Sequence, residues 1–219
     1  MDKKTLLSGV MLACMIGVIL LAMFSKLSLI VGVDNFSFSL SHCLLPLLGS
    51  LFGVTGCFAL FSSLFAVRFI SGALHFAYCG VPTLCASLAW TRYARLLNLF
   101  IPAVAMILFV AHPVGSQAMA YACFWFIPMI IALFKLNNRF FTALASTFLA
   151  HAVGSVMHLY VVNSMTPAAW MQLIPVVALE RLIAAMGMYV VITSAHMLLN
   201  FVVHAVKSKQ YKRSESVLH

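Results

Sequence analysis

Long apolar runs separated by short polar breaks make up most of the chain. Eight of these runs predict membrane helices, because a helix that crosses a bilayer needs about 20 apolar residues. They are 6–29, 38–52, 54–70, 74–90, 96–112, 117–134, 140–162 and 169–203. If part of 36–90 is re-entrant, six segments remain. The pattern therefore predicts an all-α, polytopic helical membrane protein with about six to eight membrane segments.

The last apolar run, 169–203, is too long for one upright crossing. As a single helix it would measure about 50 Å, against a hydrocarbon core of about 30 Å. Either this helix tilts and projects into the cytoplasm, or the part up to Pro175 lies at the outer surface and the span begins near Val177. Both alternatives predict Glu180 in the outer half of the membrane.

Composition excludes a separate soluble domain. Hydrophobic residues make up 64% of the 219 positions and charged residues only 8%, which is typical of an integral membrane protein. We therefore expect a single membrane domain over 1–219. Its N-terminal apolar run is long and has no clear small-x-small cleavage site, so we interpret it as a retained first span.

The net charge of +9 indicates topology and not a nucleic-acid partner. The basic residues that flank the apolar runs form four groups: Lys3 and Lys4; Arg92 and Arg95; Lys135 and Arg139; and Lys207, Lys209, Lys212 and Arg213. The positive-inside rule places all four groups on the cytoplasmic face. Both termini, 1–4 and 206–219, are then cytoplasmic, and the runs after residue 95 form two hairpins in a cytoplasmic (inner) membrane.

Two histidines and one charged pair stand out within the apolar runs. His151 and His158 are seven residues apart, so on a helix they lie about two turns apart on nearly the same face. Glu180 and Arg181 are costly inside hydrocarbon, which makes them a functional-site hypothesis. Because adjacent residues on a helix point about 100° apart, we expect Glu180 to bind a solute and not to be a structural partner of Arg181.

The membrane depths expected for polar and aromatic residues of the predicted segments indicate a candidate small-molecule site that opens to the outside. Apolar and aromatic walls with a few convergent polar groups are typical of such sites. The candidate residues are Glu180, Arg181, His151, His158, Trp125, Trp170, Tyr121, Arg68 and His112. Tyr121, Trp125 and His151 are expected near the middle of the membrane, and the others towards its outer half.

Small residues recur every four positions in three places. Gly9, Ala13 and Gly17 form such a stripe in the first run, where another helix could approach closely. The two further stripes are Ser146, Ala150 and Gly154, and Gly49, Gly53 and Cys57. Each stripe is explained either by packing within the bundle or by association with a separate membrane subunit.

Enzyme motifs are absent from the sequence. It has no HExxH, GxSxG or P-loop pattern and only four acidic residues, so we expect no cofactor, and ATP-driven transport would need other subunits. The alternative is a stand-alone multi-pass membrane protein: a lipid- or quinone-linked enzyme, or a b-type haem carrier. The haem ligands would then come from His75, His112, His151 and His158.

A family resemblance adds to this interpretation. The Gly9, Ala13, Gly17 stripe, the semi-polar stretch 28–41 and the segment PLLGSLFG at 46–53 resemble the S-components of energy-coupling factor transporters, the all-helical membrane subunits that capture a vitamin or related micronutrient. The resemblance implies about six helices and a solute in the outer half. It also implies that the stripe docks on a transmembrane coupling subunit, which works with ATPase subunits. The histidine-rich N-terminal sequence of the nickel and cobalt members is absent here, which argues against a metal substrate.

Overall fold

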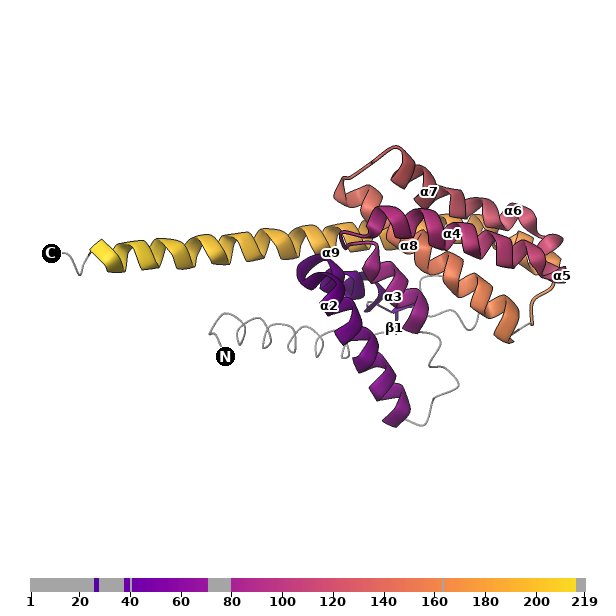
Figure 1. Ribbon diagram of the computed structural model, residues 1–219, viewed down its shortest axis with the longest axis horizontal. Coiled ribbons are helices and arrows are strands. Elements are labelled where there is room, and N and C mark those ends of the chain that lie inside the picture. Colours follow the sequence, from indigo (N-terminus) through magenta and orange to yellow (C-terminus); the bar gives the residue numbers. More distant parts are fainter. Residues whose placement is uncertain (1–25, 28–37, 40, 71–79, 163, 216–219) are drawn as a thin grey trace.

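The computed structural model describes residues 26–27, 38–39, 41–70, 80–162 and 164–215 (Figure 1). These residues are almost entirely helical. The elements are β1 (Lys26–Leu27), β2 (Phe38–Ser39), α2 (Ser41–Ile70), α3 (Gly80–Leu88), α4 (Ala94–Ala111), α5 (Pro113–Ser116), α6 (Met119–Ala122), the 3-10 turn η2 (Cys123–Trp125), α7 (Phe126–Leu133), α8 (Arg139–Met157), the π-helical turn η3 (His158–Val162) and α9 (Pro167–Glu215). The helical class predicted from the sequence is confirmed.

A short antiparallel pairing of β1 with β2 is the one departure from helix among the described elements. Lys26 pairs with Ser39 and Leu27 with Phe38. The pairing lies at the two ends of the semi-polar stretch 28–41, which the apolar pattern did not predict to contain strands.

A bundle of α4, α6, η2, α7, α8 and the first part of α9 forms the main body of the described chain. α4 and α8 run in the same direction, because the Tyr160 hydroxyl of η3 donates to the Leu108 carbonyl near the end of α4, over 2.8 Å. The path through α6, η2 and α7 returns along them, and α9 runs antiparallel to α8, with His158 beside Trp170 at one end. The two hairpins predicted from the basic clusters are therefore confirmed as adjacent antiparallel pairs.

Three described helices are long and apolar enough to cross a membrane: Ala94–Ala111, Arg139–Val162 and Pro167–Phe201. The apolar stretches Pro46–Ala59 and Met119–Leu133 are shorter. The six to eight predicted segments are therefore only partly represented. Of the predicted run 74–90, the described part is α3, whose nine residues measure about 14 Å, and the run 6–29 lies largely outside the described residues.

A sharp kink divides α2 at Gly53, where the sequence predicted two segments to meet. Gly53 has φ 60° and ψ −145°, a combination that glycine adopts readily because it has no Cβ. The turn brings Gly56 back beside the Leu48 carbonyl. The expected stripe of Gly49, Gly53 and Cys57 is thus not one continuous helical face.

α3 packs on α8 through the small-residue stripe of α8. The Ser146 hydroxyl donates to the Ala86 carbonyl over 2.7 Å, and a Cβ built on Gly154 would meet only the Pro82 ring at 3.8 Å. Small side chains at these positions let the two helix backbones approach closely. The residues at the two ends of this stripe therefore serve packing within the bundle.

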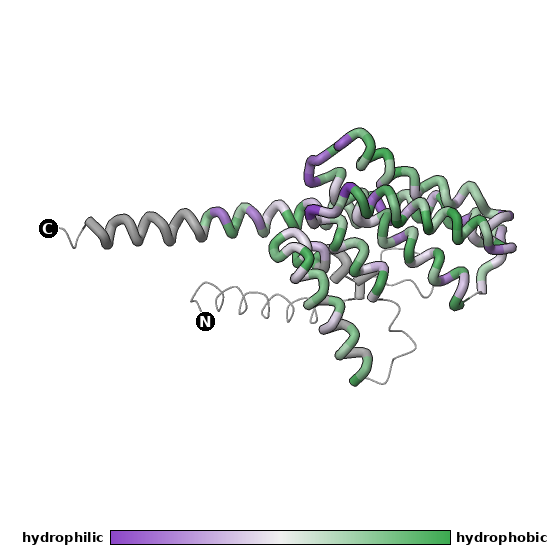
Figure 2. The backbone as a smooth tube through the Cα atoms, viewed as in Figure 1, coloured by the Kyte–Doolittle hydropathy of each residue, from purple (hydrophilic) through white to green (hydrophobic). Residues whose placement is uncertain are grey.

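α9 is a single helix of 49 residues that continues through Pro175. Its length is about 74 Å, and Figure 1 shows it projecting well past the bundle towards the C-terminus. Figure 2 shows a mainly hydrophobic bundle, with hydrophilic backbone at the loops and on α9 where it leaves the bundle. Of the two alternatives for the last apolar run, the structure matches the continuous, projecting helix.

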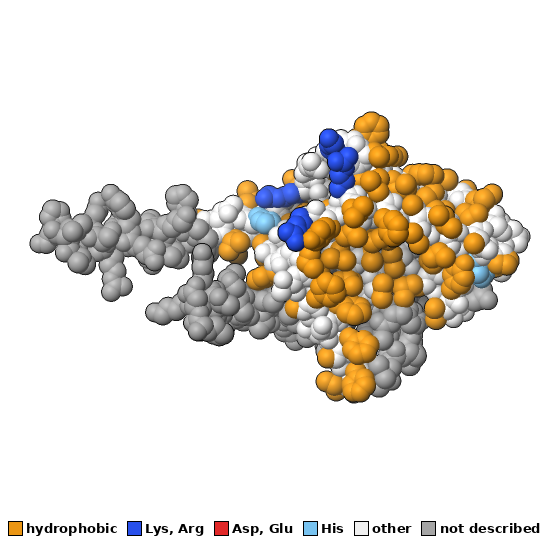
Figure 3. Space-filling model, viewed as in Figure 1, with side chains coloured by type: hydrophobic (Ala, Val, Ile, Leu, Met, Phe, Trp, Pro, Cys, Tyr) orange, Lys and Arg blue, Asp and Glu red, His pale blue; other side chains and the backbone are white. Residues whose placement is uncertain are grey.

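The Lys and Arg side chains visible in Figure 3 lie at the end of the bundle from which α9 projects. Arg92 precedes α4 and Arg95 lies in its first turn, whereas Lys135 lies in the turn from α7 to α8 and Arg139 is the first residue of α8. Apolar side chains cover most of the remaining surface in this view. The hairpins were predicted from the same basic residues, under the rule that such residues flank membrane segments on one side.

Candidate functional site

Six aromatic side chains from six elements, α4, α6, η2, α8, η3 and α9, meet inside the bundle, and we call them the Tyr121 cluster. Its members are Phe109, Tyr121, Trp125, His151, His158 and Trp170. Tyr121 is central, with its ring centroid 4.8 Å from Trp170 and 5.3 Å from His151. The sequence named five of these six residues as candidates, and the structure brings all five together.

Two tryptophans of the cluster come from different elements. Trp125 comes from η2 and Trp170 from the first turn of α9, and their exposed fractions are 0% and 2%. Both rings pack edge-on against Phe109, at centroid distances of 5.2 and 5.4 Å. Trp170 is therefore a core residue of the bundle.

The two histidines of α8 and η3 lie on the cluster side of their helix, as the seven-residue spacing predicted. The His151 ring contacts Tyr121 and Trp125, whereas the His158 ring contacts Trp170 at 5.9 Å. His151 lies twelve residues after Arg139, or about 18 Å along the helix. It is therefore near the middle of the bundle, and His158 is nearer the end opposite the basic loops.

Four ring nitrogens of the cluster are buried without a hydrogen-bond partner among the described residues. They are Trp125 Nε1, Trp170 Nε1, His151 Nε2 and His158 Nε2. A buried polar atom left unpaired costs about 1–3 kcal/mol. Eight such side-chain atoms are found in the described part of the chain, and four of them belong to this one cluster. Unpaired buried polar atoms are therefore concentrated at the Tyr121 cluster.

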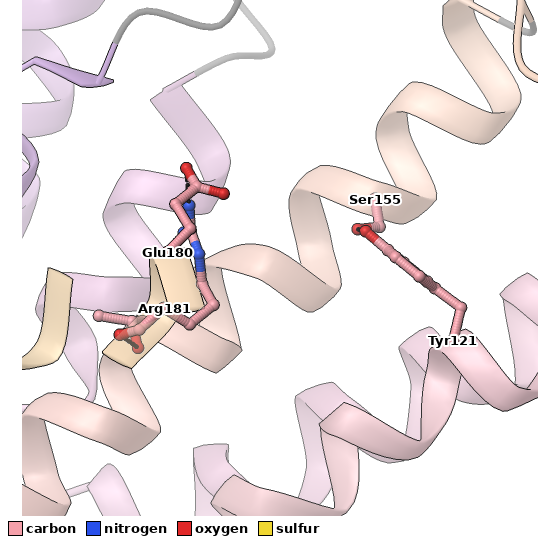
Figure 4. A network of polar contacts seen from close by, with 5 residues as sticks. Tyr121, Ser155, Glu180 and Arg181 are labelled. Atoms are coloured by element: carbon pink, nitrogen blue, oxygen red, sulfur yellow. Dashed lines mark hydrogen bonds and ion pairs between the residues drawn. The ribbon is translucent and has the colours of Figure 1, made fainter. Parts of the chain in front are cut away.

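The Tyr121 hydroxyl is the polar group of the cluster that has a partner. It lies 3.3 Å from the Ser155 hydroxyl, and either oxygen can donate. Figure 4 shows this contact between α6 and α8. Because Ser155 is buried and four residues after His151, its hydroxyl lies on the same face of α8 as the histidine.

Glu180 and Arg181 form an ion pair with each other, contrary to the expectation that they need separate partners. Arg181 Nη2 lies 2.6 Å from Glu180 Oε1, and Figure 4 shows the two side chains together on α9. Adjacent Cα–Cβ bonds do point apart on a helix, but the long arginine side chain folds back far enough to reach the carboxylate.

The structure also gives the position of the charged pair along the bundle. The Thr147 hydroxyl lies 3.5 Å from the Arg181 carbonyl oxygen, so the charged pair is level with Thr147 of α8. Thr147 is eight residues after Arg139, or about 12 Å from the basic end of a helix that measures about 36 Å with η3. The pair therefore lies in the half of the bundle nearer the basic loops.

Two other sequence candidates are His112 and Arg68. His112 accepts a hydrogen bond from the Val114 backbone N–H at Nδ1 and packs on the Tyr160 ring, so it caps α5 at the end of the bundle and is not a member of the cluster. Arg68 is in the last turn of α2, and its side chain lies outside the described residues.

Phe109 and Ser155 were missed by sequence reasoning. Phe109 is one of several apolar residues on α4, and only the packing of α4 against α6 and α9 distinguishes it. Ser155 had a usable signal, since it lies one helical turn after His151 on the same face. The proposed docking residues Gly9, Ala13 and Gly17 lie outside the described residues.

The described residues contain no group of three or more histidine, cysteine, aspartate or glutamate side chains placed to hold a metal ion. No family model, curated protein or solved structure matches the chain. The chemistry of the site must therefore be inferred from its own side chains.

Proposed function

We propose that this chain is the substrate-binding membrane subunit of an importer for a vitamin-like micronutrient, with the solute bound at the Tyr121 cluster. The observation that carries the proposal is the presence of four buried, unpaired ring nitrogens in one aromatic cluster. Small-molecule sites combine apolar and aromatic walls with a few such polar groups. A solute that pairs with these nitrogens would recover the free energy that their burial costs.

The position of the cluster supports solute entry from the face opposite the basic loops. Trp170 and His158 lie near the ends of α9 and η3 that are remote from those loops. If the basic loops are cytoplasmic, as the positive-inside rule requires, this face is the outer one. Both termini are then on the cytoplasmic side, and the protein belongs in the cytoplasmic membrane.

Transport by such a subunit requires partners, because this sequence contains no nucleotide-binding motif. We assign docking on a transmembrane coupling subunit to the stripe of Gly9, Ala13 and Gly17, on the basis of its spacing. ATPase subunits would supply the energy. This assignment rests on sequence and on the resemblance to S-components.

Mass spectrometry of the purified protein tests the proposal. We expect the detergent-solubilised chain to retain a small molecule that is lost from Trp170→Ala and kept by Trp90→Ala. Trp90 is a matched control because its indole nitrogen is also buried and unpaired but it packs in a different core cluster. A chain that carries no small molecule, or one that shows a Soret band, would contradict the importer proposal.

A further inference from the structure

The two indole groups restrict what the solute can be. Trp125 Nε1 and Trp170 Nε1 are buried and have no acceptor among the described residues. An indole N–H can only donate a hydrogen bond. The missing partner of each indole is therefore an acceptor atom. Both indole rings pack against Phe109, so one molecule with two acceptors is the simplest partner for both.

The two histidines of the cluster can also pair with polar atoms of a solute. His151 Nε2 and His158 Nε2 are also buried and unpaired, and each can donate or accept according to its tautomer. The neighbouring rings meet Tyr121 and Phe109 mostly edge-on or tilted, at centroid distances from 4.8 to 6.3 Å. Walls made of ring faces and edges favour a flat aromatic molecule, because such rings stack or meet edge-to-face.

Charge further narrows the class of solute. The charged side chains of α9 nearest the cluster, Glu180 and Arg181, neutralise each other across 2.6 Å. The members of the Tyr121 cluster itself are aromatic residues that carry no fixed charge. A charged solute would therefore lack a counter-charge in a buried site, where an unpaired ion is strongly disfavoured.

We infer that the solute bound at the Tyr121 cluster is an uncharged, planar heteroaromatic compound with at least two hydrogen-bond acceptors. Trp125 and Trp170 donate to those acceptors and thereby determine specificity. This inference rests on the proposed function, since it assigns the ligand of the same site.

Three probes of equal shape test the inference: naphthalene with no ring nitrogen, quinoline with one and quinoxaline with two. All are neutral near pH 7. Transfer from water into an apolar site or a detergent micelle follows hydrophobicity, and it would favour naphthalene. Pairing with the indole donors reverses that order. We expect affinity, measured by calorimetry against a detergent blank, to rise from naphthalene to quinoxaline by about threefold to tenfold per nitrogen.

Conservative variants identify the donors. Trp125→Phe and Trp170→Phe keep an aromatic ring but remove the N–H, so each should reduce quinoxaline affinity by about threefold to tenfold and leave naphthalene affinity nearly unchanged. Trp90→Phe should change neither. If a variant does not fold, the order of the three probes on the unaltered chain still decides the question.

The outcomes separate this inference from the proposed function. Binding in the order of hydrophobicity, or no binding of quinoxaline, would overturn the inference. A co-purifying solute that is lost from Trp170→Ala would in that case still support the proposed function. If the chain carries no solute, the proposed function fails. Quinoxaline binding that depends on Trp125 and Trp170 would in that case show that the two indoles can donate to a ligand, but not that the chain carries a solute.

Discussion

Arg181 pairs with Glu180, the residue directly before it on α9, with Nη2 2.6 Å from Oε1. Their side chains are 16% and 21% exposed, respectively. The carboxylate is therefore compensated within its own helix, and it does not need a solute for that purpose. We therefore expect the pair to act mainly in the stability of the fold.

Removing the carboxylate should destabilise the protein more than it weakens solute binding. Glu180→Gln leaves the Arg181 guanidinium partly buried without a counter-charge. For a fully buried pair the loss is about 3–5 kcal/mol, and partial exposure reduces it to about 1–3 kcal/mol. Thermal unfolding in detergent should show a lower midpoint, with the amount of co-purified solute little changed.

The double variant Glu180→Gln, Arg181→Gln provides the control. It removes both charges, so it should be less destabilised than the sum of the two single variants. Normal stability with loss of solute in Glu180→Gln would instead show that the carboxylate contacts the solute.

Close packing of α2 on α3 predicts opposite results for two glycine substitutions. A Cβ on Gly49 would overlap the Ser87 backbone carbonyl, whereas a Cβ on Gly154 would lie 3.8 Å from the Pro82 ring. Gly49→Ala should therefore lower stability by about 1–3 kcal/mol, because two helices must move apart. Gly154→Ala should be neutral or stabilising, since alanine favours helix over glycine. Equal thermal midpoints for the two variants would argue against this packing.

The arrangement of the C-terminal bundle was predictable because the sequence contains two independent signals for it. Apolar runs gave the helices, and the basic groups at Arg92, Arg95, Lys135 and Arg139 gave their directions. The face of α8 that carries His151 and His158 followed from helical periodicity alone. These signals are local, so no tertiary information was required.

The remaining details depend on tertiary register, which the sequence does not contain. The position of Glu180 along the bundle depends on where α9 meets α8, and contacts such as Thr147 with Arg181 and His158 with Trp170 determine this. Phe109 belongs to the site because α4 packs against α6 and α9. In the sequence alone, nothing distinguishes it from the other apolar residues of α4. In the same way, the kink at Gly53 lies at a boundary that the apolar pattern located, but the pattern does not give its backbone angles.

Cysteine labelling should distinguish the two ends of the bundle. Single cysteines at Ser116 and Ser164 should react with an impermeant maleimide added outside, and cysteines at Thr91 and Asn137 should react only after permeabilisation. Ser116 is preferred to Gly115, where a Cβ would overlap the Phe109 carbonyl. The background chain should lack its native cysteines, since Cys123 is exposed. Labelling of Asn137 in intact cells would reverse the proposed topology.

The last prediction concerns the stripe in the first apolar run and uses uptake as its measure. Ala13→Leu places a bulky side chain between Gly9 and Gly17 and should separate helix backbones that must touch a coupling subunit. We expect the variant to fold and retain co-purified solute, while uptake of that solute in cells is lost. Ala22→Leu is the matched control, because nine residues at about 100° each put Ala22 on the opposite face of the same helix, and uptake should persist. If Ala13→Leu instead prevents folding, the stripe packs within this chain and the coupling subunit must dock on another surface.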